Sequence, residues 1–362
     1  MLPLIKTHLP QREILMNKLE EILYSGYIAQ GEAVEKFERS FEKFIGSGYT
    51  LSLNSGTAAL HIALILAGVK EGDEVISTAM TAEPTNVAIK MAGATIRWAD
   101  VDYETGNISP IAIENVINEK TKAIIVVDYA GTPVDVKRIQ EISLKYNIPV
   151  IEDAAHALGA TYNGKKTGNH FPFTVFSFQA IKHLTTIDGG ALQIQNKELY
   201  EKGKLIRWFG LDKNLSRLDN NIQDQGYKYH MNNVNATIGL VQLETIEELL
   251  KKYFTIGKYL DLKLTGIPGL ETVIHYPNSE SSYWLYTLKV ERRDDFVKMM
   301  TENGFMASEI HKRNDLHTFL NDCPTEMPNL DRFYSRLVHI PCGWWVTTED
   351  CDKMIDLINK GW

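Results

Sequence analysis

Apolar and polar positions beyond about residue 50 follow a rhythm that predicts strands and helices in turn. Short apolar runs are typical of buried strands, and apolar residues at helical spacing separate them. The predicted strands are Tyr49–Leu53, Glu74–Ser77, Thr95–Val101, Ala123–Val127, Val150–Glu152, Val175–Phe178 and Ala191–Gln195. The predicted helices are Thr57–Leu66, Asn86–Met91, Ser109–Val116, Val136–Tyr146 and Lys197–Phe209. This alternation predicts an α/β fold, with a mainly parallel sheet and helices on both of its faces.

The pattern changes towards both ends of the chain. Two amphipathic helices are predicted near the start, over Gln11–Tyr24 and Glu32–Phe44. Near residue 245 a long helical stretch is followed by shorter strands and a helix. The predicted elements there are a helix over Val234–Tyr253, strands over Thr272–His275 and Tyr283–Val290, and a helix over Asp294–Asn303. We therefore predict a large domain over residues 1–245 and a smaller C-terminal α+β domain over residues 246–362.

Bulk properties narrow the class of protein. The 362 residues are enough for two full cores. A net charge of −8 and the lack of a basic stripe argue against a nucleic-acid partner. The start of the sequence carries no signal-peptide pattern, and no apolar tract is long enough to predict a membrane span. Cys323, Cys342 and Cys351 have no metal-ligand spacing, so we expect no metal site and reduced thiols in a cytoplasmic protein.

Candidate chemistry gathers around Lys182. This lysine follows the aromatic stretch Phe173–Phe178 and precedes two hydroxyls and a glycine turn within Thr185–Gly190. Upstream, the apolar strand that ends in Ile151–His156 places Asp153 at its tip. Ligands of such sheets bind beyond the carboxyl ends of the strands. An amine, a carboxylate and hydroxyl groups at that edge suit pyridoxal 5'-phosphate, which needs a partner for its aldehyde, its ring nitrogen and its phosphate.

Each of these groups also has an ordinary structural interpretation. Asp153 could cap a helix, and His156 could be a half-buried histidine bonded to backbone. The turn Ser55–Ala58 is a common helix start, although the free N–H groups of a helix N-terminus also suit a phosphate. The combination of these groups favours a cofactor site over the separate structural roles.

The motifs resemble those of the StrS/DegT family of pyridoxal-phosphate-dependent nucleotide-sugar aminotransferases. The matching segments are Asn54–Thr57, Glu152–Gly159, Ser177–Lys182 and Thr185–Gly190. The resemblance covers nearly the whole chain, and it implies the fold type I architecture of pyridoxal-phosphate enzymes and a homodimer with shared active sites. It also implies L-glutamate and a nucleotide-linked keto sugar as substrates.

The resemblance assigns roles to particular residues. Lys182 is implied as the catalytic lysine that holds the cofactor aldehyde and moves protons during amine transfer. Asp153 is implied to pair with the ring nitrogen, and His156 to lie near the ring. The full set of implied cofactor-binding residues is Gly56, Thr57, Ala58, Asp153, His156, Ser177, Lys182 and Lys228.

The sequence departs from the family pattern in two segments. In Gly226–Asn232, Lys228 stands where an asparagine usually meets the phosphate across the dimer, and His230 stands in place of an arginine. A lysine can still meet a phosphate, but as a point charge. In Met80–Asn86, Ala82 occupies the place of the aromatic residue that usually stacks on the cofactor ring. Another residue must cover that ring face, or the stack is weaker.

The substrate-binding residues and the reaction type leave alternatives open. Segment Glu309–Asp315 could bind substrate or be a solvated loop, and the tryptophans of Trp208–Gly210 and Trp344–Trp345 could line a pocket or a core. Family dehydratases carry a histidine in place of the lysine, so Lys182 argues against sugar dehydration. A cysteine desulfurase would need a cysteine near the site. The remaining alternative is a DegT-like sensor or regulator without catalysis.

Overall fold

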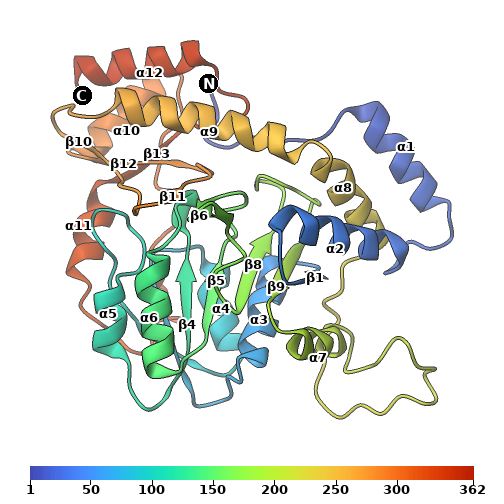
Figure 1. Cartoon of the computed structure of the whole chain (residues 1–362). Coiled ribbons are helices and arrows are strands. Elements are labelled where there is room, and N and C mark those ends of the chain that lie inside the picture. Colours follow the sequence, from blue (N-terminus) through green and yellow to red (C-terminus); the bar gives the residue numbers. More distant parts are fainter.

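The computed structural model describes residues 1–362, with a seven-stranded sheet at its centre (Figure 1). Its strands are β1 (Tyr49–Leu53), β2 (Glu74–Ser77), β3 (Thr95–Trp98), β4 (Thr121–Val127), β5 (Val150–Asp153), β8 (Phe173–Ser177) and β9 (Gly190–Ile194). They lie in the order β1-β9-β8-β5-β4-β2-β3. Strand β9 runs antiparallel to β1 and β8, and the other pairs are parallel. The prediction of an α/β fold with a mainly parallel sheet is confirmed.

Helices cover both faces of the sheet, as Figure 1 shows. They are α3 (Gly56–Leu66), α4 (Glu83–Met91) and α7 (Lys197–Arg207) on one face, and α5 (Pro110–Val116) and α6 (Val136–Tyr146) on the other. Side chains alternate across β4: Ala123 and Ile125 join the core with α3, whereas Ile124 and Val126 join the core with α5 and α6. Both faces are buried, which explains the continuous apolar runs of the strands.

A third core joins the start of the chain to the sheet. Helices α1 (Arg12–Leu23) and α2 (Glu32–Ile45) pack against α8 (Asn233–Leu243). Phe37 and Phe41 of α2 make edge-to-face contacts with Phe178, and Phe41 makes another with Phe176 of β8. The aromatic stretch before Lys182 is therefore fixed from behind by α2.

The prediction of one helix over Val234–Tyr253 is wrong. Two helices occupy this stretch, α8 and α9 (Ile246–Lys263), and Thr245 between them has φ −124°. Helix α8 packs against α1 and α2, whereas α9 packs against α12 (Thr348–Lys360). Each helix buries its own apolar face. Apolar residues at helical spacing therefore continue in the sequence although the first helix ends at Leu243 and a second begins at Ile246.

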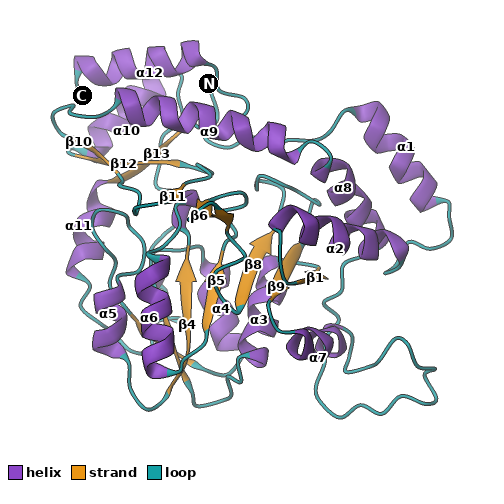
Figure 2. Cartoon of the chain, in the orientation of Figure 1, coloured by secondary structure: helices purple, strands orange, loops and turns teal.

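The C-terminal part has its own antiparallel sheet and core (Figure 2). Its elements are β10 (Leu270–Thr272), β12 (Tyr286–Val290), α10 (Arg293–Glu302), α11 (Pro328–Arg336), β13 (Leu337–Ile340) and α12. The predicted strand at Tyr283–Val290 begins later because Tyr283 has a positive φ of 49°. Two-residue strands β6 (Thr161–Tyr162), β7 (Lys165–Lys166) and β11 (Ser279–Glu280) form a third small sheet. The domain division at residue 245 stays a prediction.

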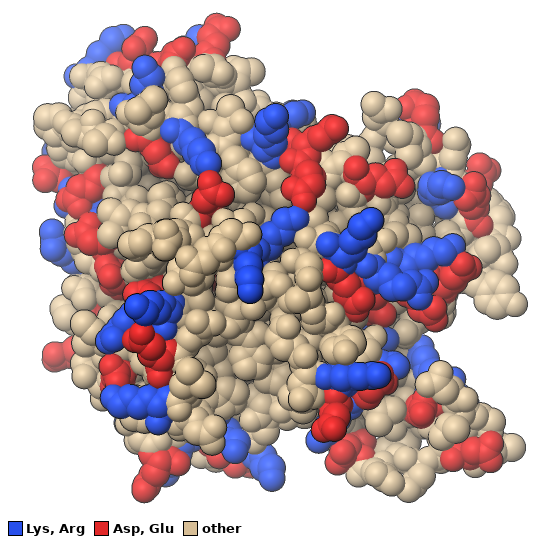
Figure 3. All heavy atoms as spheres, in the orientation of Figure 1, with Lys and Arg blue, Asp and Glu red and all other residues tan.

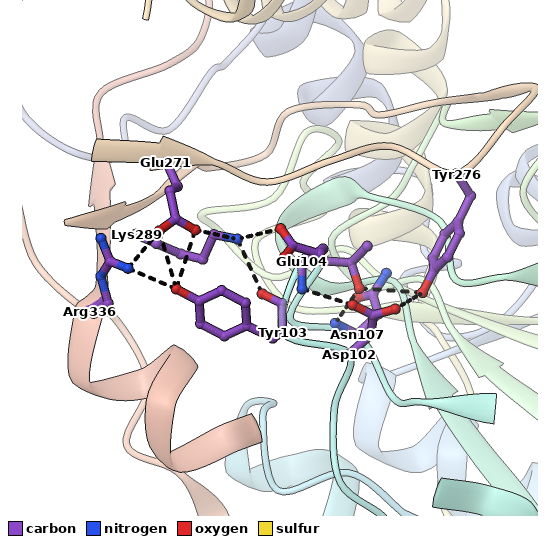
Figure 4. A network of polar contacts seen from close by, with 9 residues as sticks. Asp102, Tyr103, Glu104, Asn107, Glu271, Tyr276, Lys289 and Arg336 are labelled. Carbon is purple, nitrogen blue, oxygen red and sulfur yellow. Dashed lines mark hydrogen bonds and ion pairs between the residues drawn. The ribbon is translucent and has the colours of Figure 1, made fainter. Parts of the chain in front are cut away.

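A charged network joins this C-terminal sheet to the turn after β3 (Figure 4). Lys289 of β12 is fully buried, and its Nζ lies 3.0 Å from Glu104 and 3.3 Å from Glu271. Arg336 donates to Glu271 at 2.6 Å and to the Tyr103 hydroxyl at 2.9 Å. A buried cation left without these carboxylates would be strongly destabilising, so the network fixes how the two parts meet.

Acidic and basic side chains are interspersed over the face of the molecule shown in Figure 3. No helix combines the length and the apolar character that crossing a membrane requires.

Candidate active site

A cavity of about 400 Å³ lies where β5 and β8 end and α3 begins. Six of the predicted site residues line it: Gly56, Thr57, Asp153, His156, Ser177 and Lys182. Segments separated by more than one hundred residues therefore meet at the edge of the sheet where the cofactor site was predicted from the sequence. Ala58 and Lys228, also predicted as cofactor-binding residues, do not line the cavity.

The N-terminus of α3 forms one wall. Ser55 caps this helix, and its Oγ accepts a hydrogen bond from Ala58 N–H at 3.1 Å. The N–H groups of Gly56 and Thr57 belong to the first helical turn, which has no intrahelical acceptors and favours an anion. A Cβ added at Gly56 would lie 3.1 Å from Ser177 Cβ, so glycine lets β8 approach. At Gly190 an added Cβ would lie 2.5 Å from the carbonyl carbon of Ser55, which requires glycine at the start of β9.

Asp153 is held as a hydrogen-bond acceptor on the opposite wall. Its Oδ2 accepts from the Thr85 hydroxyl at 2.7 Å, and its Oδ1 accepts from Ala155 N–H at 3.1 Å. Burial raises the pKa of Asp153, while these two donors and the charge of Lys182 oppose the increase. Asp153 as a whole is 4% exposed and is therefore shielded from bulk water.

Lys182 extends into the same cavity. Burial lowers the pKa of its amine to about 7, and the charge of Asp153 opposes the decrease. A lysine with a pKa near neutrality is available both as a nucleophilic amine and as a proton carrier. The amine lies 3.8 Å from the ring centroid of Trp284, a residue that the sequence analysis did not select.

His156 stands beside this pair in its neutral form. Burial and the charge of Lys182 lower the pKa of His156 well below its usual value. Its ring stacks on Trp284 with centroids 3.9 Å apart and planes inclined by 21°. The buried Nδ1 atom has no hydrogen-bond partner in the chain, which leaves it available to a bound molecule.

Segment Glu309–Asp315 is fixed to the site region and is not a free loop. Asn314 is fully buried; its Nδ2 donates to Thr81 O at 2.8 Å, and its Oδ1 accepts from Asn86 at 2.8 Å. This anchorage holds the ring of His311 parallel to that of His156, with centroids 5.7 Å apart. The sequence of this segment alone could not predict where it lies, because the anchorage of Asn314 depends on contacts with residues over 200 positions earlier.

The other uncertain aromatic residues lie outside the cavity. The indole N–H groups of Trp344 and Trp345 donate to Lys6 O and Pro3 O, so these residues hold the first segment of the chain. Trp208 packs against Phe209 and His230. Trp344 and Trp345 pack against the core that contains α2 and β8, whereas Trp208 lies outside the cores and lines a separate hollow beside α7.

Two departures from the family motifs are visible in the structure. Ala82 lines the cavity between Thr81 and Pro84, so this part of the wall carries no aromatic ring. Lys228 is exposed, and only its carbonyl meets the site region, where it accepts from Asn54 Nδ2 at 3.2 Å.

The cavity residues fit pyridoxal phosphate. The first turn of α3 and Ser177 offer donors to a phosphate, Asp153 offers an anion to a protonated ring nitrogen, and Lys182 offers an amine to an aldehyde. The unpartnered Nδ1 of His156 adds a polar contact that the protein itself does not satisfy.

A second buried acid lies next to Asp153 but outside the cavity. Glu152 is fully buried, and its Oε2 accepts from the Thr174 hydroxyl at 2.8 Å and from Gly168 N–H at 3.3 Å. Its Oε1 and the Oδ2 of the buried Asp128 have no partner. Burial and the charge of Asp153 raise the pKa of Glu152 to about 7, while the two donors oppose the increase.

Glu152→Gln should make the stability of the protein less sensitive to the rise in pH from 4.5 to about 7. Native Glu152 keeps its proton up to about pH 7, whereas the unfolded chain releases it near its ordinary value of 4.5. Wild-type stability therefore decreases as pH rises through this window, by up to about 3 kcal/mol for this group. The measurement is the unfolding free energy of the variant minus that of the wild type across this pH range. The difference should become more positive as pH rises. A difference independent of pH would mean that Glu152 is ionised throughout. Glu302→Gln, on the exposed side of α10, is the control.

Comparison with known proteins agrees with this geometry. The model of the DegT/DnrJ/EryC1/StrS aminotransferase family matches residues 11–359. The chain is similar to AtS13 from Actinomadura melliaura, with 39% identity, a TM-score of 0.97 and coverage of 100% and 99% of the two chains. It is also similar to the sugar aminotransferase CalS13 from Micromonospora echinospora, with 35% identity, a TM-score of 0.96 and full coverage of both chains. Spr1654 from Streptococcus pneumoniae, solved in a PLP form, is 28% identical over 99% and 98% of the chains, with a TM-score of 0.90. Because the family model matches nearly the whole chain, the chain belongs to the DegT/DnrJ/EryC1/StrS aminotransferase family, whose cofactor is pyridoxal phosphate.

Proposed function

We propose that this aminotransferase moves an amino group from L-glutamate to the ketone of a deoxysugar linked to a nucleoside diphosphate. The observation that carries the proposal is the amine of Lys182, which lies in a cavity with Asp153 and has a pKa lowered to about 7 by burial. Such an amine can act as a nucleophile and as a proton carrier at neutral pH, and transamination needs both.

The proposed roles of the residues follow from their chemistry. When bound, pyridoxal phosphate supplies an aldehyde that combines with amines and a ring that withdraws electrons. Lys182 would hold the aldehyde and carry protons, and Asp153 would keep the ring nitrogen protonated. His156 would contact the ring, and the N-terminus of α3 with Ser177 would bind the phosphate. Lys228 would contact the phosphate from the second subunit of a homodimer.

The choice of substrates rests on the family and its members. CalS13 is described as a sugar aminotransferase, which supports a sugar as the acceptor. The nucleotide linkage, the glutamate donor, the homodimer and the cytoplasmic location extend the sequence-based resemblance and are proposals. The proposed ketone lies at carbon 3 or carbon 4 of the sugar, and the keto sugars used in the test below distinguish the two.

A catalytically silent regulator is the second candidate. A protein that had lost catalysis would not need to retain the enclosed amine of Lys182 or the two hydrogen bonds that orient Asp153. Both features favour the enzyme over the regulator.

The test of the proposed function starts from the visible absorption spectrum of the purified, cofactor-loaded protein. L-glutamate should bleach the absorbance of the lysine-bound cofactor and release an equal amount of 2-oxoglutarate, and D-glutamate serves as the mirror-image control. Nucleotide-linked 3-keto and 4-keto deoxysugars are then added in turn. One of them should restore the absorbance and gain an amino group, detected by mass spectrometry.

Two results would count against the proposal. A coloured protein that ignores L-glutamate would require another amino donor. Bleaching by L-glutamate without recovery on any nucleotide-linked keto sugar would require another class of acceptor.

A further inference from the structure

Ser282 and Trp284, which precede β12, contact the loops that carry the active-site residues. Ser282 N–H donates to Gly131 O at 2.9 Å, and the Ser282 hydroxyl donates to His156 O at 3.1 Å. The Ser282 carbonyl lies 3.1 Å from His183 Nε2. This segment of the C-terminal part therefore contacts loops from three different strand ends of the large sheet.

Trp284 contacts the site residues through its side chain. The indole N–H donates to Ile181 O at 2.9 Å, one residue before Lys182. The ring lies 3.8 Å from Lys182 Nζ and stacks on His156 at 3.9 Å. The tryptophan is 1% exposed and belongs to the main core, so its ring has little freedom to move.

The amine of Lys182 has few other sources of stabilisation. The groups whose charges act on it or respond to it are Asp153, His156, His183 and His311. Of these only Asp153 is an acid, and burial lowers the pKa of each of the three histidines, which favours their neutral forms. An aromatic face within 6 Å of a poorly solvated ammonium attracts it through the negative ring face.

We infer that Trp284 is a positioning residue for Lys182: its ring holds the free amine whenever the lysine is not attached to the cofactor, and its stack on His156 keeps lysine and histidine in a fixed relation. The inference rests on the proposed role of Lys182 and adds a residue from the C-terminal part to the site. The free amine would then stay over the Trp284 ring, close enough to attach to the cofactor again.

The experiment measures the Lys182 amine directly in the cofactor-free, full-length protein. Competitive acetylation with limiting acetic anhydride is followed over a range of pH values, and the Lys182 peptide is quantified by mass spectrometry. Trp284→Leu removes the aromatic face but keeps an apolar side chain, so the pKa of Lys182 should decrease by about one unit. Trp284→Phe keeps a ring and should stay closer to wild type.

Trp98 provides the matched control. It is fully buried in the same core, and its indole N–H also has an acceptor, Asn321 Oδ1 at 3.3 Å. Trp98→Phe and Trp98→Leu should leave the pKa of Lys182 unchanged. If Trp284→Leu leaves that pKa unchanged or raises it in a folded protein, the ring does not hold the amine and the inference is wrong.

A second readout separates this inference from the proposed function. Borohydride reduction of the cofactor-loaded wild type, Trp284→Leu and Trp284→Phe should fix the cofactor on the Lys182 peptide in each protein. A label on another lysine would overturn the proposed role of Lys182. A label on Lys182 together with an unchanged Lys182 pKa in Trp284→Leu would overturn only the positioning role of Trp284.

Discussion

Lys182→Ala should abolish amine transfer, with a decrease of about 10⁴-fold or more in the rate of the glutamate half-reaction. The substitution removes the nucleophilic amine and the proton carrier at once, and no other lysine lines the cavity. The measurement is single-turnover conversion of L-glutamate to 2-oxoglutarate by the cofactor-loaded variant, together with its visible spectrum, which should lack the absorbance of a lysine-bound cofactor.

The fold of this variant should remain intact. Lys182 is half-buried and its side chain enters a cavity where burial opposes its charge, so alanine removes a poorly solvated group without opening a packed core. We expect an unchanged or slightly higher thermal midpoint. Lys353→Ala, on the exposed side of α12, is the control for loss of a lysine. Wild-type turnover by purified Lys182→Ala would refute the assignment of this lysine.

The large sheet was predictable because its strands are buried on both faces. A strand such as β4 is then apolar at nearly every position, which distinguishes it from the amphipathic helices around it. In parallel sheets the strand ends that bind ligands lie at one edge, so the positions of Asp153 and Lys182 followed from the strand assignments. The C-terminal part has no such pattern: α11, β13 and α12 were not predicted, and their packing depends on tertiary contacts.

Trp284 and Thr85 show why part of the site could not be predicted. Trp284 lies about one hundred positions beyond Lys182 and next to a strand, where a tryptophan is most simply explained as core. Thr85 lies on α4, and only the packing of that helix against the sheet brings its hydroxyl to Asp153. In both cases the local sequence is compatible with an ordinary buried residue, and the function comes from a long-range contact.

Asp153→Asn should slow the glutamate half-reaction by about 10²- to 10³-fold, because it removes a charge that is placed in advance in a shielded site. Asparagine has the same shape, but one of its two polar atoms is a donor. Both carboxylate oxygens of Asp153 accept hydrogen bonds, from Thr85 and from Ala155 N–H, so the amide must oppose one of these donors. The loss of the charge should also decrease the pKa of Lys182 further below about 7, since Asp153 opposes the effect of burial on it.

These two effects can be measured together and separated by a milder variant. The rate is obtained from single turnovers with L-glutamate, and the pKa of Lys182 from competitive acetylation of the cofactor-free protein. Thr85→Val removes a donor to Asp153 and leaves its charge in place, so the rate should decrease much less than in Asp153→Asn. If Asp153→Asn reacts within a few-fold of wild type while Lys182 remains essential, the ring nitrogen does not depend on this carboxylate. If Thr85→Val is as slow as Asp153→Asn, the orientation of the carboxylate matters as much as its charge, because a misplaced anion in a shielded site stabilises the wrong position.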